Sequence, residues 1–266
     1  MAKKAAPRPV TASKLDRGVL GAGRVNGARR SQRRNEKASE QIAQQIVHDI
    51  VAQGLRTGDR LPLEAEMVQH YGFSRSSLRE GLRLLEVQGL IRIRPGPGGG
   101  PVVGAVDAAN LARTSTLYFH LAGSTYDELL DAQIALEPLC AELAAHHPDR
   151  RAAMKPYLSD EMPDGEDAYR GLTDSFHQTV YDLAGNSVLC LLAHAVTEIV
   201  TVHVVATMDP VALRPKILTE HRNIAVAIAA GQHQKARALM TDHFGQQHAH
   251  YRKTAANRLA ELIEWR

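Results

Sequence analysis

The sequence predicts a mainly α-helical protein of two domains. The first domain is expected to hold three helices plus a β-hairpin, and the second an all-α bundle of six or seven helices. Two observations predict this. Three stretches with helical apolar spacing precede two short apolar stretches that flank a run of Gly and Pro at residues 95–101. Beyond them, apolar residues recur at helical spacing to the C-terminus, without a persistent alternating pattern. A chain of 266 residues with 44% apolar residues can supply two cores.

The first two helices are predicted between residues 39 and 72. Isoleucines recur at every fourth position from Ile42 and give an amphipathic helix over residues 39–53, with Ser39 and Gly54 at its ends. A second helix should place three side chains inward: Leu63, Met67 and Val68. Gly72 is expected to end it, because a tight turn favours a residue that tolerates positive φ.

The third helix is predicted to follow an N-cap at Ser74. One of its faces is apolar: Leu78, Leu82 and Leu85. Another face carries arginines at every fourth position: Arg75, Arg79 and Arg83. Such a row can be no more than a solvated helix face. Here the row begins at the N-terminus of a helix that follows a turn, and serines are interleaved with it: Ser74, Ser76 and Ser77.

This arrangement favours DNA recognition over a solvated face. Arginine can donate two hydrogen bonds to O6 and N7 of guanine, whereas serine hydroxyls and helix-terminal amides suit phosphates. After the helix, Ile91 and Ile93 alternate with arginines and predict a half-buried strand, and residues 102–103 supply its partner. The Gly- and Pro-rich tip lacks bulky side chains and could approach the DNA backbone. Together these elements predict a winged helix-turn-helix at residues 38–104.

Residues 42–103 resemble the GntR family of bacterial transcriptional regulators. The motifs that carry the resemblance are Gly-Asp-Arg-Leu-Pro from residue 58, Ser-Arg-Ser-Ser-Leu-Arg-Glu from residue 74, Leu-Leu-Glu from residue 84 and Gly-Leu-Ile from residue 89. The resemblance implies that Arg75 and Arg79 read bases, that the three serines lie near phosphates and that Gly96 lies in the wing. Ala65 departs from the family, in which many members have an arginine at this position, so a DNA contact is missing.

Residues 1–37 form a basic segment. They hold eleven Lys and Arg against two acids, a net charge of +9, whereas the whole chain carries +3 and the remainder therefore −6. The segment has few large apolar side chains, which predicts a disordered tail. It is either a solubilising extension, or a start codon assigned too early, or an arm that lies along DNA phosphates.

Two cysteines, Cys140 and Cys190, lie within apolar helical patterns and indicate a reducing cytoplasm instead of a disulfide framework. We expect no signal peptide, and the sequence contains no uninterrupted apolar run of membrane-spanning length. A bacterial cytoplasmic, nucleoid-associated protein without a membrane partner is therefore expected.

Residues 105–266 resemble the FCD ligand-binding domain of the FadR-like GntR branch. The carriers are Leu-Glu-Pro from residue 136, Phe-His from residue 176, Gly-Asn from residue 185, Glu-His-Arg from residue 220 and Ala-Arg from residue 236 with His243. The length favours the seven-helix form of that domain. The resemblance implies a sensor of small molecules that also dimerises.

Three histidines match those with which many FCD domains hold a divalent cation: His177, His221 and His243. Imidazoles that converge in a helical bundle suit Zn²⁺, Ni²⁺ or Mn²⁺. Most other histidines of the domain, such as His146, His147, His233, His248 and His250, are expected to be ordinary surface residues. The family's fourth ligand, an aspartate, is replaced by Thr173, and Asp174 follows it at three residues before His177. Asp174 either completes the site or points elsewhere, which would leave a three-histidine site or a metal-free pocket.

The resemblance places Gln133, Thr173 and Asn186 at the effector pocket. Many relatives have an arginine in place of Gln133 that can pair with an acidic effector. Its absence disfavours a small dicarboxylate and favours a neutral or largely apolar effector, such as an acyl compound.

The sequence therefore predicts a homodimeric transcription factor and not an enzyme. It is expected to repress from a pseudo-palindromic DNA operator and to be released by an unidentified small metabolite. One alternative is a zinc-dependent enzyme built on the three histidines, although neither a His-Glu-x-x-His arrangement nor a clear general base accompanies them. Another is an architectural DNA binder without an effector, which leaves the second domain without a role.

Overall fold

The computed structural model describes residues 25–96, 98–105, 107–159, 161, 163–206 and 211–265, with the backbone alone for 25–35 and 212. The chain divides into two compact units, Met1–Ala105 and Val106–Arg266. The division falls one residue from the expected boundary.

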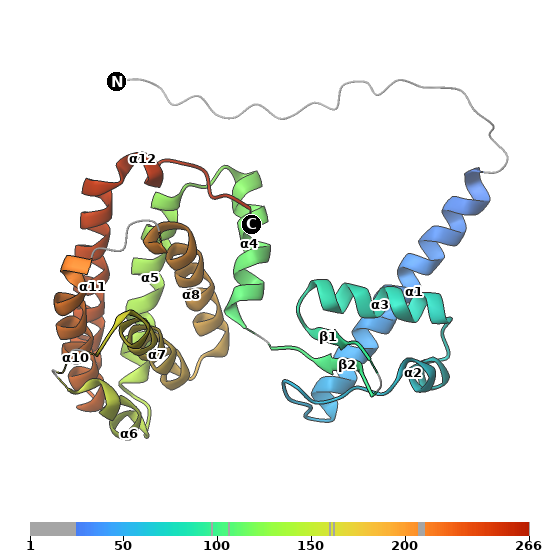
Figure 1. The fold of residues 1–266 in the computed structure, drawn as a ribbon, viewed down its shortest axis with the longest axis horizontal. Helices are drawn as coiled ribbons and strands as arrows, with labels where there is room; N and C mark the ends of the chain where they lie inside the picture. Colours follow the sequence, from blue (N-terminus) through green and yellow to red (C-terminus); the bar gives the residue numbers. More distant parts are fainter. Residues whose placement is uncertain are drawn as a thin grey trace. The chain divides into compact units, whose positions relative to one another are not determined.

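The first unit holds three helices and a two-stranded antiparallel hairpin (Figure 1). Its elements are α1 (Val25–Ala52), α2 (Glu64–Tyr71), α3 (Arg75–Val87), β1 (Ile91–Arg94) and β2 (Gly100–Val103). The strands pair from Ile91 opposite Val103 to Arg94 opposite Gly100. Apolar side chains from all three helices and the hairpin form one core, which includes Ile42, Ile46, Met67, Leu78, Leu82, Leu85 and Ile91. The order of the elements confirms the fold that the sequence predicts.

Helix α1 begins much earlier than the sequence pattern indicates. It starts at Val25, so that residues 25–37 are helical and not part of a disordered tail; residues 1–24 of that tail lie outside the described residues. Ser39 is buried inside the helix, and its hydroxyl donates to the carbonyl of Glu36 (2.8 Å). The segment holds four arginines and one residue each of Gln, Ala, Glu and Lys, which have high helix propensity, so the helix can extend through it without an apolar face.

Two apolar side chains of this domain were placed wrongly by the sequence pattern. Leu63 precedes α2 as its N-cap residue and is exposed, because the helix begins at Glu64. Ile93 is also exposed, whereas Ile91 on the same strand is fully buried. The hairpin therefore anchors through its base, and its distal half projects from the core.

The regular elements of the second unit are all helices among its described residues. Its α-helices are α4 (Ala108–Ala122), α5 (Tyr126–Ala144), α6 (Arg150–Met154), α7 (Glu166–Ala184), α8 (Ser187–Val200), α10 (Arg214–Ala229), α11 (His233–Thr254) and α12 (Ala256–Leu259). Short 3₁₀ or π segments follow α6 and α8 and precede α10. Helix α11 packs along α5 and α10, and α5 also packs against α7 and α8 (Figure 1). The six long helices agree with the predicted bundle.

One segment of the described residues, Ser187–Val205, is long and apolar enough to span a membrane by length and composition. The segment is not an uninterrupted apolar run, because His194 and Glu198 lie within it. The segment comprises α8 and the π-helical turn Thr201–Val205, and its buried residues belong to the cores of the domain. Glu198 and Thr201 from the same segment line a cavity. A core helix of this kind explains the apolar composition.

Candidate functional site

The turn between α2 and α3 positions the predicted recognition helix. Gly72 ends α2 in the left-handed conformation (φ 69°), as the sequence predicts. Ser74 caps α3, and its Oγ accepts from the backbone N–H of Ser77 (3.1 Å). The hydroxyls of Ser76 and Ser77 both lie 2.9 Å from the Ser74 hydroxyl. Ser76 is exposed, whereas Ser77 is buried, so Ser77 belongs to the cap of the helix more than to its surface.

Three arginines are exposed along one face of α3: Arg75, Arg79 and Arg83. Arg79 forms an ion pair with Glu64 at the start of α2 (Nε to Oε2, 2.8 Å). This pair is exposed and adds little stability. It nevertheless gives the guanidinium a defined position next to the first turn of the helix.

The hairpin provides a second exposed, basic element. Arg92 and Arg94 are exposed on β1, and Gly96 follows at the tip with a positive φ of 94°. A side chain is strained at this φ, so the glycine keeps the tip narrow. Helix and hairpin together present the two elements that a winged helix-turn-helix directs toward DNA.

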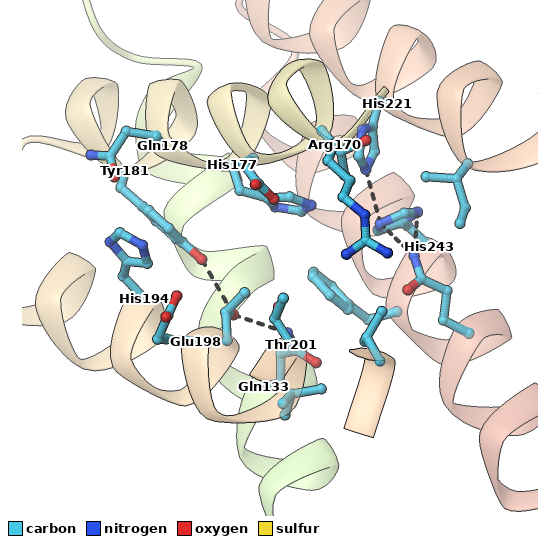
Figure 2. Close-up of a pocket in the computed structure, with 18 of the residues that line it drawn as sticks. Gln133, Arg170, His177, Gln178, Tyr181, His194, Glu198, Thr201, His221 and His243 are labelled. Carbon is cyan, nitrogen blue, oxygen red and sulfur yellow. Dashed lines mark hydrogen bonds between the residues drawn. The ribbon is translucent and has the colours of Figure 1, made fainter. Parts of the chain in front are cut away.

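The helical domain contains a cavity of about 270 Å³ that is partly open to the surface. Its lining comes mainly from α5, α7, α8, α10 and α11. Figure 2 shows His177, His221 and His243 with their rings directed toward one another, and Tyr181, His194 and Glu198 at the other end of the cavity.

The three histidines form a compact group of donors. One nitrogen from each imidazole lies within 4.8 Å of those of the other two. The Nε2 atoms of His221 and His243 are 3.2 Å apart. Three nitrogens around one tetrahedral cation, each about 2.1 Å from it, lie about 3.4 Å apart. The pair from α10 and α11 already has this spacing, and a small movement of His177 would complete it.

Two carboxylates lie close to the Nδ1 atoms of His177 and His243. Glu220 Oε2 is 2.8 Å from His243 Nδ1. Glu137 Oε2 is 3.7 Å from His177 Nδ1, and Glu137 is completely buried. Gln247 Nε2 lies 2.8 Å from His243 Nε2, on the cavity side. His177 and His243 thus each have a carboxylate near Nδ1, and Nε2 of His243 faces Gln247 and His221.

Burial sets the charge of the imidazoles. Burial lowers the pKa of His221 well below its usual value, and the nearby His243 and His177 lower it further. Burial also lowers the pKa of His243, although the hydrogen bond with Glu220 opposes the shift. Both rings are therefore neutral at pH 7 and can offer a lone pair to a cation. Burial disfavours the ionised form of Glu137, but His177, Thr197 and Tyr181 outweigh it and hold its pKa below the usual value.

The candidate pocket residues fall into two groups. Gln133, Thr173 and Asp174 line the cavity, as expected. Asp174 is not one of the donors that lie within 4.8 Å of one another, a group that among the described residues contains the three histidines alone. Asn186 does not line the cavity. It caps α8, and its Oδ1 accepts from the backbone N–H of Leu189 (3.1 Å), which explains an Asn after a helix-ending Gly.

Sequence reasoning missed several side chains of the site. Glu137 and Glu220 were read only as parts of motifs, although Glu220 directly precedes His221. Gln247 lies four residues after His243, one helical turn away, and this spacing could have indicated it. Arg170, which lines the cavity and pairs with Glu166 (2.5 Å), occurs seven residues before His177 on the same helix.

Comparison with known families separates the same two parts of the chain. The model for "Bacterial regulatory proteins, gntR family" matches residues 38–99, and the model for the FCD domain matches residues 128–246. The two matches occur in the order of the DNA-binding fold and the cavity-bearing domain. The chain thus carries a DNA-binding domain of the gntR family and an FCD domain.

Relatives of this chain include named regulators. It is 30% identical to the Uxu operon regulator of Haemophilus influenzae over 53% of each chain. It is 25% identical to the Uxu operon transcriptional regulator of Escherichia coli K12 over 70% of this chain and 76% of that one. The chain thus spans about half the length of the first relative and three quarters of the second. A GntR structure from Streptococcus agalactiae has the same fold, with a TM-score of 0.58 and 22% identity over 79% of this chain and 99% of that one.

Proposed function

We propose that this regulator binds a pseudo-palindromic operator as a homodimer and releases it when a small metabolite occupies the helical domain. The observation that carries the proposal is the combination of an exposed arginine face on α3 with a histidine-lined cavity in the other domain. The two domain matches support a regulator with a ligand-binding half. The relatives named as operon regulators support the same class of function.

On the DNA side, Arg75 and Arg79 would read base edges in the major groove. Arg83, Ser74 and Ser76 would contact the backbone, and Gly96 would let the wing approach it. Ser77 would act through the helix cap, because its side chain is buried. Helices α2 and α3 hold these groups in fixed positions, so binding would require little reordering of the recognition face.

On the sensor side, His177, His221 and His243 would hold one divalent cation. The donor set fits Zn²⁺, Ni²⁺ or Mn²⁺, since all three ligands are imidazoles and the two buried rings are held neutral. When bound, the cation would offer open positions to an oxygen ligand. Asp174 lines the same cavity and could reach the cation through water.

The chemistry of the cavity suits an effector that carries polar groups on an apolar frame. Apolar atoms supply the larger part of the lining surface, and hydrogen-bonding side chains are interspersed among them, including Gln133, Thr173, Gln178, Thr201 and Gln247. Arg170 brings a positive charge, while Asp174 and Glu198 bring negative charges. We therefore propose a small hydroxylated metabolite with at most one carboxylate, which would bind the cation and use its hydroxyls on the polar wall.

The proposal assigns no catalytic activity, in keeping with a family of transcription regulators. It also places the protein in the bacterial cytoplasm, at the nucleoid.

A selection from random duplex DNA would identify the operator, and gel shifts would then compare variants. Arg75→Ala and Arg79→Ala should each weaken specific binding by about 10- to 100-fold, because one bidentate guanine contact is worth about 1–3 kcal/mol. Arg151→Ala, an exposed arginine in the helical domain, is the matched control and should bind normally. Equal operator affinity for the wild type and both α3 variants would defeat the assignment. A thermal-shift screen with hydroxy acids and acyl compounds, each with and without Zn²⁺, would test the effector class.

A further inference from the structure

The side chain of Glu137 lies beneath the histidine cluster in an unusual environment. It is 0% exposed. A buried carboxylate destabilises the folded state unless hydrogen bonds and an opposite charge compensate it. The contacts of its two carboxylate oxygens show how Glu137 is accommodated.

One oxygen of Glu137 is fully occupied. Oε1 accepts from the hydroxyl of Thr197 (2.6 Å) and from the hydroxyl of Tyr181. Thr197 in turn accepts from Gln133 Nε2 (2.9 Å), whose Oε1 lies 3.0 Å from His248 Nε2. This chain of hydrogen bonds joins α5, α8 and α11 and fixes the orientation of the carboxylate.

The other oxygen faces His177. Glu137 Oε2 and His177 Nδ1 are 3.7 Å apart, and neither atom has a hydrogen-bond partner among the described residues. Both atoms are buried. A carboxylate held at this place can accept only from Nδ1–H of the ring. Its hydrogen bond would therefore select the tautomer in which Nε2 carries the lone pair.

The second carboxylate, Glu220, has the same relationship to His243, at hydrogen-bonding distance. Glu220 Oε2 lies 2.8 Å from His243 Nδ1, and His243 Nε2 faces His221 Nε2 at 3.2 Å. A histidine that binds a metal through one nitrogen commonly donates from the other to a carboxylate, which fixes the ring and makes it a stronger ligand. Glu137 lies beside Nδ1 of His177 as Glu220 lies beside Nδ1 of His243.

We propose that Glu137 is the positioning residue of the cation site: it accepts from His177 Nδ1–H, sets the ring to bind through Nε2, and supplies buried negative charge for the cation. The proposal rests on the proposed metal site. Neither an aspartate at residue 173 nor Asp174 is needed in this arrangement, because the charge is balanced from behind the imidazoles. Glu137 is not itself a ligand, since the three imidazoles form the donor group without it.

Glu137→Gln tests this inference. The substitution keeps the shape and an acceptor for Thr197 and Tyr181, but it can turn an N–H toward His177 Nδ1 and so favour the wrong tautomer. Zn²⁺ affinity, measured by competition with a chromophoric chelator, should fall by about 10- to 100-fold. The matched control is Glu142→Gln on the same helix. Glu142 pairs with Arg237 (2.7 Å) and does not line the cavity, so this variant should retain wild-type Zn²⁺ affinity.

A spectroscopic measurement on the wild type does not depend on how well the variant folds. Long-range ¹H–¹⁵N NMR of the Zn²⁺-loaded protein should show His177 bound through Nε2 and protonated at Nδ1. Binding through Nδ1, or equal Zn²⁺ affinity in the wild type and in Glu137→Gln, would overturn the role of Glu137 while the metal site stands. Failure of the wild type to bind Zn²⁺ would overturn the metal site itself, and the role of Glu137 with it.

Discussion

Gly81 of α3 meets the backbone of α1 at Ser39. A Cβ added at Gly81 would lie 2.9 Å from the carbonyl oxygen of Ser39 and 3.2 Å from Cγ2 of Ile42. The absence of a side chain thus allows the recognition helix to press directly on the long first helix. Since Ser39 is buried inside α1, its backbone cannot move away without disturbing the core of the domain.

We expect Gly81→Ala to destabilise the DNA-binding domain by about 1–3 kcal/mol, as for other over-packed core positions. The matched control is Gly171→Ala on α7, an exposed helical glycine with nothing within 4 Å of the added Cβ. There the gain in helix propensity should stabilise the helical domain by up to about 1 kcal/mol. In urea denaturation, the free energy of unfolding should therefore fall for the first domain in Gly81→Ala and rise for the second domain in Gly171→Ala. Equal or greater stability of Gly81→Ala would show that α1 and α3 are less closely packed than described.

The second prediction concerns His248, which the sequence places at the surface of α11 but which is buried in the structure. Its Nε2 lies 3.0 Å from Gln133 Oε1. Its Nδ1 is buried without a partner. Burial, with a contribution from the charge of Arg252, lowers the pKa of His248 to about 4. The unfolded chain therefore binds this proton near the usual pKa of about 6.5, and the folded chain only near 4.

The stabilising contribution of neutral His248 is present above pH 6.5 and is lost as the pH falls toward 4. A shift of this size corresponds to about 3 kcal/mol across that window. His221 and His243 act in the same direction, because their pKa values are also lowered. The measurement is the free energy of unfolding in chelator from pH 7 to pH 4, where His248→Gln should flatten the dependence. An identical pH profile in the variant would rule out His248 as a contributor.

The local features of the DNA-binding domain could be predicted from the sequence, whereas the start of its first helix could not. The inner stripe of α3, the cap at Ser74 and the turn at Gly72 follow from local spacing and turn chemistry, and the structure confirms them. The start of α1 could not be read in this way, because a solvated helix without an apolar stripe leaves no periodic signal. The three cavity histidines were identified by resemblance to a family.

Side chains that act through long-range contacts escaped prediction. Glu137 carries no local mark of burial, and its partners Tyr181 and Thr197 come from other helices 44 and 60 residues along the chain. Asn186 was assigned to the pocket because it belongs to a family motif, yet its side chain is used by the start of α8. A motif identifies which residues recur together, and only the packing of helices shows whether they face the cavity.

The third prediction concerns the cation. Metal that binds the folded state alone stabilises it by linkage, so a chelator should lower the melting temperature of the helical domain. Protons compete with the cation for each imidazole, and the metal-dependent part of the stability should therefore shrink as the pH falls toward 5. His221→Ala should lose the chelator effect and the response to the effector but retain operator binding, since α3 belongs to the other domain. Differential scanning calorimetry with and without EDTA would measure this. A metal-free wild type that answers its effector normally would contradict the model.

The last prediction concerns residues 1–24, which hold six Lys and Arg against one aspartate. If this segment lies along DNA phosphates, its deletion should weaken binding to any DNA sequence and make the affinity less dependent on salt, because fewer counterions are released. Preference for the operator over random DNA should remain, since the arginines of α3 are intact. Replacement of the six basic residues by Gln, with the length unchanged, should reproduce the effect and so separate charge from chain length. Fluorescence anisotropy over a salt series would measure the slope, and an unchanged slope in both variants would show that the segment does not contact DNA.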